Sequence, residues 1–80
     1  MKLIYDPKHN IAYLRLHAKK REVETIQLSD ELNVDVAPDG TVYGIELLNA
    51  NEQLRAEDEG KFVVEAEGRR QAISLVDQLP

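Results

Sequence analysis

The sequence predicts a small domain of the α+β class that is mainly β. Three observations support this prediction. Short segments with apolar residues at every second position, which is typical of strands, recur between residues 2 and 48. Clusters of Pro, Gly, Asn and Asp separate these segments, as turns do. Good helix formers then dominate residues 49–59. We therefore expect an antiparallel β-meander of about five strands, followed by a short helix and then by a tail.

The first two strands are expected to flank a turn. Lys2–Asp6 contains a short apolar run, and Ile11–Leu16 alternates with a period of two residues. Between them, Pro7 fixes its own φ, and the side chains of Asp6 and Asn10 can bond the nearby backbone. The segment "YDPKHNIAYLRL" is therefore interpreted as a β-hairpin and not as a reactive site.

Three further strands complete the predicted sheet. Val23–Leu28 is rich in β-branched residues, and "SDE" interrupts it. Leu32–Ala37 is the clearest half-buried strand, because its Leu and two Val alternate with polar residues or Ala. Thr41–Leu48 pairs with it in a second hairpin.

The turn of this second hairpin is predicted from "APDG". Pro38, Asp39 and Gly40 occupy positions that suit a type I turn closing into a bulge. Gly44, inside the following strand, indicates a bulge or a close packing neighbour. We therefore assign structural roles to these residues, and to Asp6 and Pro7 in the first turn.

The C-terminal part is predicted with less detail. The helix at 49–59 ends at Gly60, and the acids Glu57–Glu59 oppose the dipole at its C-terminus, so we expect that end to fray. The tail, 61–80, fits two interpretations. One is a hairpin that turns at Glu67–Arg70, and the other is a helix with its apolar residues on one side.

Length, composition and charge restrict the classes of function. A chain of 80 residues is expected to form one domain, 1–80, and to bury only roughly 60% of its unfolded surface. It has no Cys for disulfides, and two His make a zinc centre improbable, so a partner chain is the remaining common source of stability. We find neither a signal peptide nor a membrane span and expect a cytoplasmic protein.

The charge is unevenly distributed along the chain. The net charge is −5, and residues 29–60 hold nine Asp or Glu against one Arg. Overall acidity argues against nucleic-acid binding, because phosphate contacts supply most of its affinity. The basic cluster at Lys19–Arg21 is the single feature that favours such contacts, and two acids follow it closely.

One segment partly matches a calcium-binding loop. Asp35, Asp39, Gly40 and Glu46 fall at the first, fifth, sixth and twelfth positions of that pattern. The third position is Ala37, which offers no side-chain oxygen, and the flanking segments are predicted strands and not helices. We therefore interpret the segment as a β-turn and predict no metal ligands.

The remaining reactive side chains do not combine into a catalytic pattern. His9 and His17 stand at opposite ends of one predicted strand, roughly 8 residues of ~3.3 Å apart. Ser29 and Ser74 lack the elbow motif of serine hydrolases, and the four Gly are too dispersed to cradle a phosphate. We predict no catalytic residue, no cofactor and no small-molecule ligand, and hence not an enzyme.

Several short motifs, in order, resemble a known family. They are "YDP" at Tyr5–Pro7, "AYLRL" at Ala12–Leu16, "VDV" at Val34–Val36, "DG" at Asp39–Gly40 and "GIELLNA" at Gly44–Ala50. The series resembles the short prokaryotic proteins named domain of unknown function twenty-two eighty-three, over about residues 2–54. Asn10, where the family commonly has an acid, and Asn51, where Ser is more usual, depart from it. The resemblance implies a compact β-meander followed by a helix and no established activity.

The leading functional hypothesis is a non-catalytic interaction or dimerisation domain. The partner is a second copy or another small protein. Its interface is expected at Ile11, Tyr13 and Tyr43. Ile11 and Tyr13 give their strand apolar side chains on both faces, whereas a strand with strict alternation has one polar face. An antitoxin-like protein, whose acidic middle segment neutralises a small basic toxin, is the alternative. A small enzyme would need a pocket with a convergent acid or His, which the sequence does not indicate.

Overall fold

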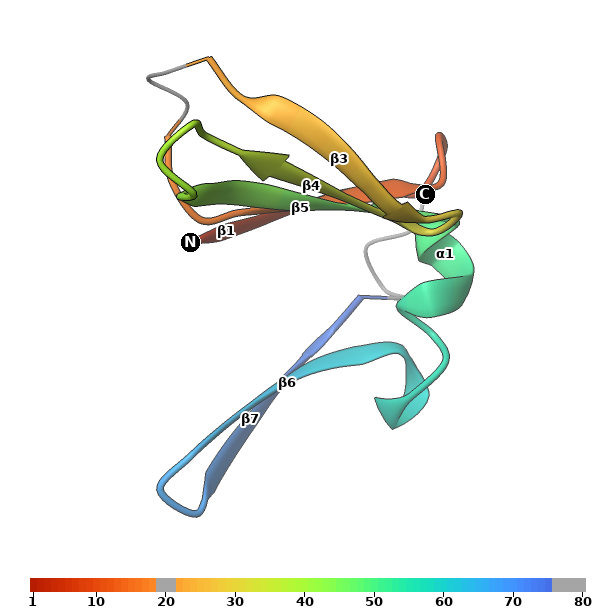
Figure 1. Cartoon of the computed structure of the whole chain (residues 1–80). Helices are drawn as coiled ribbons and strands as arrows, with labels where there is room; N and C mark the ends of the chain where they lie inside the picture. The colour runs from red at the N-terminus through yellow and green to blue at the C-terminus, as the bar shows by residue number, and fades with distance from the viewer. Residues whose placement is uncertain (19–21, 76–80) are drawn as a thin grey trace. The chain divides into compact units, whose positions relative to one another are not determined.

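The computed structural model describes residues 1–18 and 22–75 (Figure 1). Within it the chain divides into two compact units, residues 1–50 and residues 51–80, and each is described here by itself. The single domain expected for residues 1–80 stays a prediction. In the described part of the chain, no helix reaches the length and apolarity needed to cross a membrane.

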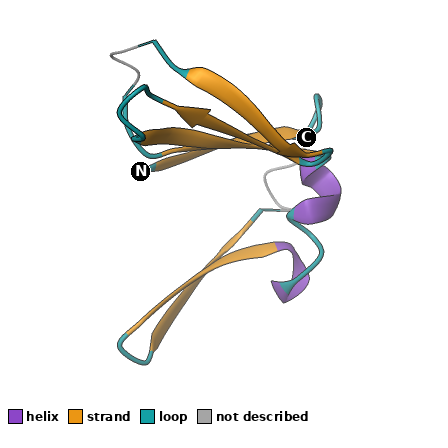
Figure 2. Ribbon diagram, viewed as in Figure 1, coloured by secondary structure: helices purple, strands orange, loops and turns teal. Residues whose placement is uncertain are grey.

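The first unit is one antiparallel sheet, which confirms the predicted fold class (Figure 2). Its strands are β1 (Lys2–Asp6), β2 (Ile11–Arg15), β3 (Glu24–Ser29), β4 (Leu32–Val36) and β5 (Val42–Leu48). They lie in the order β1-β2-β5-β4-β3, so β5 is central and β1 and β3 are the edges. β1 pairs with β2, and β3, β4 and β5 pair in succession. The connection from β2 to β3 crosses to the far edge of the sheet. For this reason β5, and not β3, lies beside β2.

The β1–β2 turn is held by local hydrogen bonds and by bonds to the residues that follow β5. The amide of Asn10 donates to the carbonyl of Pro7 at 3.3 Å, and Asn10 adopts a φ of 59°. The Asn10 side-chain nitrogen donates to Oδ1 of Asn49 at 3.2 Å. The amide of Ala50 donates to the Asn10 carbonyl at 3.1 Å. These bonds tie the first turn to the end of β5.

The β4–β5 turn depends on Asp39 and Gly40. Gly40 has a φ of 90°, in the left-handed region that favours glycine, and its amide donates to the carbonyl of Ala37 at 2.9 Å. Oδ1 of Asp39 accepts a hydrogen bond from the amide of Thr41 at 2.9 Å. The register between β4 and β5 then shifts just before Val36, so that Tyr43 has no direct partner in the β4–β5 pairing. The turn therefore ends in an irregularity near Gly44, as the sequence indicates.

The second unit begins with little helix. Helix α1 spans only Ala50–Gln53, and a single 3₁₀ turn, η1, follows at Asp58–Gly60. The predicted short helix is confirmed, but it is much shorter than 49–59. Asp58 and Glu59 have φ values of 52° and 56°, which no α-helix can continue.

The tail forms the predicted hairpin from β6 (Lys61–Ala66) and β7 (Arg69–Ser74). Glu67 and Gly68 join them with φ values of 52° and 77°, and two successive positive φ angles are typical of the type I′ turn that suits two-residue hairpins. The alternative of a helix is wrong for the residues of β7. The end of the tail, 76–80, lies outside the described residues.

Candidate interaction surface

The pairing of the strands places the apolar side chains of the sheet on one side. Directly opposite residues of an antiparallel pair point to the same face, and successive residues of a strand point to opposite faces. We define the apolar face by the apolar residues that the register puts together: Leu3, Tyr5, Ala12, Leu14, Ile26, Leu32, Val34, Val36, Ile45 and Leu47. The register also places Glu24 on this side, at the β3 edge. One row of this face crosses all five strands without a polar residue, from Leu3 at one edge to Ile26 at the other.

The apolar face is only partly buried. Ala12 is its one fully buried residue, while Ile26 keeps 41% of its surface exposed and the other eight members are intermediate. In residues 1–18 and 22–75, no large side chain is fully buried. A sheet that is apolar on one side normally buries that side against a second layer. Within residues 1–18 and 22–50, no second layer covers this face.

The opposite side of the sheet carries most of the polar strand residues. We define this polar face by Lys2, Ile4, Ile11, Tyr13, Arg15, Thr25, Gln27, Asn33, Asp35, Glu46 and Leu48. Two of the interface residues predicted from the sequence, Ile11 and Tyr13, lie here. The third, Tyr43, lies at the β4–β5 irregularity with its ring 5.6 Å from that of His17. Their role as an interface stays a prediction.

A hydrogen-bond network connects four strands of the polar face. The Tyr13 hydroxyl donates to Oδ2 of Asp35 at 2.8 Å, and the Thr25 hydroxyl donates to Oδ1 of the same carboxylate at 2.6 Å. Nearby, the Asn33 amide donates to Oε1 of Glu46 at 2.9 Å. Both carboxylates therefore accept bonds from side chains of other strands, and these bonds link β2, β3, β4 and β5.

Tyr13 is held in place by Gly44 as well. Its ring and hydroxyl lie so close to Gly44 that any added Cβ would collide with them. Burial, reinforced by the hydrogen bond to Asp35, raises the pKa of Tyr13 to about 12. The phenol is therefore a neutral hydrogen-bond donor at physiological pH. Gly44 thus meets the expectation of a close packing neighbour, and the neighbour is Tyr13.

The other residues singled out for chemistry are separated from one another. His9 lies in the β1–β2 turn, where its Nδ1 is 2.8 Å from Oδ2 of Asp6 and its amide donates to Oδ1 at 3.1 Å. These bonds from His9 lower the pKa of Asp6. Asp35 and Glu46 lie within the paired residues of β4 and β5, whereas His9 lies outside the strands, in the β1–β2 turn. In the described residues, no three His, Asp or Glu side chains group to hold a metal ion. The cluster at Lys19–Arg21 lies outside the described residues.

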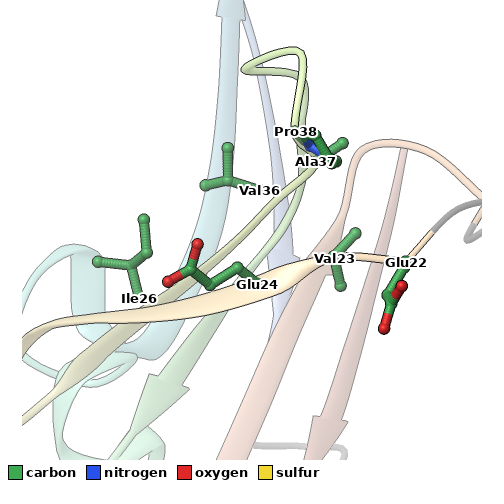
Figure 3. A pocket seen from close by; sticks show the side chains of 7 residues that line it. All are labelled: Glu22, Val23, Glu24, Ile26, Val36, Ala37 and Pro38. Atoms are coloured by element: carbon green, nitrogen blue, oxygen red, sulfur yellow. The ribbon is translucent and has the colours of Figure 1, made fainter.

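An open hollow of about 480 Å³ lies at the β3 edge (Figure 3). Its lining is apolar with two acids: Glu22, Val23, Glu24, Ile26, Val36, Ala37 and Pro38. The side chains of Glu24, Ile26 and Val36 point to the same side of the two strands. The hollow is therefore a corner of the apolar face with an acidic margin. Sequence reasoning missed it, because its two sides meet only once β3 pairs with β4.

The structure belongs to the class of small amphipathic antiparallel sheets, and its clustered polar side chains form hydrogen bonds with one another. The family model described as "Protein of unknown function (DUF2283)" matches residues 2–51, more than half of the chain. The protein belongs to this family. Comparison with curated proteins and with solved structures finds no match. The matched residues coincide with the five-stranded sheet and the first residues of α1.

Proposed function

We propose that the protein is a non-catalytic interaction domain, and that its apolar face packs against the same face of a second copy. The supporting observation is the row from Leu3 to Ile26, which is apolar across all five strands and fully buried at none of its positions. Burying such a face gains about 25 cal/mol for each Å² removed from water. An 80-residue chain without disulfides has few other sources of stability.

A second copy suits this face better than an unrelated surface does. A two-fold interface uses the same patch on both copies, and the row from Leu3 to Ile26 carries no charge, so a contact centred on this row buries no unpaired ion. Glu24, which shares this side of the sheet, is exposed at the β3 edge. With strands ~4.8 Å apart and residues ~3.3 Å along them, the face measures roughly 24 Å by 17 Å. That footprint is at the small end of specific interfaces, so we expect a dimer that dissociates at concentrations on the order of micromolar.

Two neighbouring residues of β1 provide a matched test. Leu3 belongs to the apolar face, and Ile4, which is 45% exposed, belongs to the polar face. We expect Leu3→Lys to place a charge in the interface and give a monomer. Ile4→Lys changes a side chain of the same size on the other face of the sheet and should leave the dimer intact. Sedimentation velocity of wild type and both variants, across the micromolar range, measures the outcome.

Each result of this test separates one hypothesis from the others. If Ile4→Lys dissociates the dimer and Leu3→Lys does not, the interface lies on the side of Ile11 and Tyr13 that the sequence predicts. A wild-type protein that remains monomeric and folded at high micromolar concentration contradicts dimerisation. The antitoxin-like alternative then becomes the leading hypothesis. Co-purification of a small basic protein at low salt, and its loss at high salt, would support it.

A further inference from the structure

Strand β3 is an exposed edge with few of the features that protect edges. All six of its residues, Glu24–Ser29, are exposed, and the strand ends the sheet on one side (Figure 1). Edge strands carry unpaired backbone N–H and C=O groups, and proteins usually protect them with Lys, Pro or a bulge. β3 contains no Lys or Pro, and its bulge lies between Gln27 and Ser29. The first four residues keep a regular register.

The hollow lies beside these regular residues. Ile26 and Val36 form its apolar base, and Glu22 and Glu24 are exposed beside them. Neither carboxylate has an ion-pair partner among the residues that the structure describes. An added strand would therefore meet an apolar position and an acidic position two residues apart on one face. On the other face it would meet the polar side chains of Thr25 and Gln27.

We infer that β3 binds an extended segment of another protein by strand addition, and that this segment alternates basic and apolar side chains with polar residues between them. Backbone hydrogen bonds along Glu24–Gln27 provide the attachment. An apolar side chain fills the hollow, and a Lys or Arg two residues away pairs with Glu22 or Glu24. The net charge of −5 favours the approach of a basic segment. Binding at this edge needs no dimer. Ile26 and Val36 also belong to the apolar face, so a second copy packed on that face would compete with the bound segment.

A labelled peptide with the sequence Lys-Thr-Val-Thr-Lys-Thr-Val is a direct probe. Its fluorescence anisotropy with the full chain should report saturable binding. A peptide with Glu in place of Lys should bind at least about tenfold more weakly. N-methylation of alternate peptide amides tests strand addition itself. One of the two alternating patterns should weaken binding at least about tenfold, because it blocks the amides that face β3, and the other should not.

Charge-reversal variants locate the site. The double variant Glu22→Lys/Glu24→Lys should weaken binding at least about tenfold. The control Glu57→Lys/Glu67→Lys changes the net charge equally at exposed positions of the second unit and should keep the affinity within about twofold. Leu3→Lys should also keep peptide binding, even where it abolishes the dimer.

Three results would overturn the inference. The first is an absence of peptide binding at millimolar concentration. The second is equal sensitivity to both charge-reversal pairs, which would indicate a diffuse electrostatic contact. The third is self-association of Leu3→Lys that the added changes Glu22→Lys/Glu24→Lys abolish, which would show that the edge pairs with a second copy of this chain instead.

Discussion

The two faces of the sheet contribute to stability in different ways. On the polar face, Asp35 accepts hydrogen bonds from Tyr13 and Thr25, and Glu46 accepts one from Asn33. The chain satisfies these groups internally. The apolar face has no equivalent, since its side chains gain only from being covered and its one fully buried member is an alanine. The polar face therefore stabilises the monomer, and in the proposed dimer the apolar face would supply the free energy for association.

This difference predicts which substitutions affect folding and which affect assembly. A change on the polar face should alter the free energy of unfolding at any protein concentration. A change on the apolar face should alter the concentration dependence of stability, because a partner that binds only the folded state stabilises it by mass action. The predictions below perturb the polar face and the adjoining turn.

Gly44→Ala is expected to have the largest effect. The new Cβ would collide with the ring and hydroxyl of Tyr13, which are also held by Asp35. Such overpacking usually costs about 1–3 kcal/mol, and we expect the upper end because the obstacle is a ring. Urea denaturation of Gly44→Ala and wild type measures the loss.

A double-mutant cycle shows whether Tyr13 is the cause. In a Tyr13→Ala background the obstacle is absent, so Gly44→Ala should cost at most about 0.5 kcal/mol. A similar cost in both backgrounds would contradict the assigned contact. Gly40→Ala is a useful comparison, because nothing lies within 4 Å of its added Cβ and any cost there comes from the φ of 90°.

The fold was more predictable than the surface. Period-two patterns and turn residues located the five strands of the first unit to within a residue or two, because local alternation is a direct consequence of strand geometry. The tail was left open between a hairpin and a helix. The strand order was not predictable in this way, since the pairing of β2 with β5 depends on contacts about 30 residues apart. The helix was overestimated from the propensity of 49–59: α1 ends at Gln53, and the left-handed Asp58 and Glu59 exclude helix at the end of that range.

The two faces show where sequence reasoning stopped. The alternation in Leu32–Ala37 identified the apolar side of β4 correctly, with Leu32, Val34 and Val36 together. Tyr13 was assigned to an interface because it and Ile11 give their strand apolar residues on both faces, and its sequence position gave no sign that its hydroxyl reaches Asp35, 22 residues away. Long-range polar pairs of this kind have no local signature.

Asp35→Ala tests the polar network with a smaller effect. The substitution leaves the hydroxyls of Tyr13 and Thr25 without their acceptor, and we expect a loss of about 1–2 kcal/mol. Asp35→Asn retains one acceptor oxygen and should cost less. Chemical denaturation compares both variants with wild type. If Asp35→Ala is as stable as wild type, the network does not contribute to the polar face as described.

The pH dependence of stability tests the same network without disturbing the packing of the strands. The folded-state pKa of Tyr13, about 12, lies above the ordinary value of 10.0, so the unfolded chain loses this proton first. The contribution of Tyr13 is therefore complete below pH 10 and is lost as the pH rises toward 12. The difference in unfolding free energy between wild type and Tyr13→Phe should shrink across this range. A difference independent of pH would contradict the raised pKa.

Asp6, the last residue of β1 before the turn, should show the smallest effect. Hydrogen bonds from His9 lower its pKa below 3.8, so the folded chain stays ionised where the unfolded chain takes up a proton. Its stabilisation is present above pH 3.8 and is lost as the pH falls below that value. The Asp6 and His9 side chains are 50% and 66% exposed, so solvent screens their interaction and we expect Asp6→Asn to cost less than Asp35→Ala at neutral pH. Denaturation at neutral and acidic pH measures this difference. A cost at neutral pH as large as that of Asp35→Ala would show that the turn, and not the network across the strands, dominates the stability of the polar side.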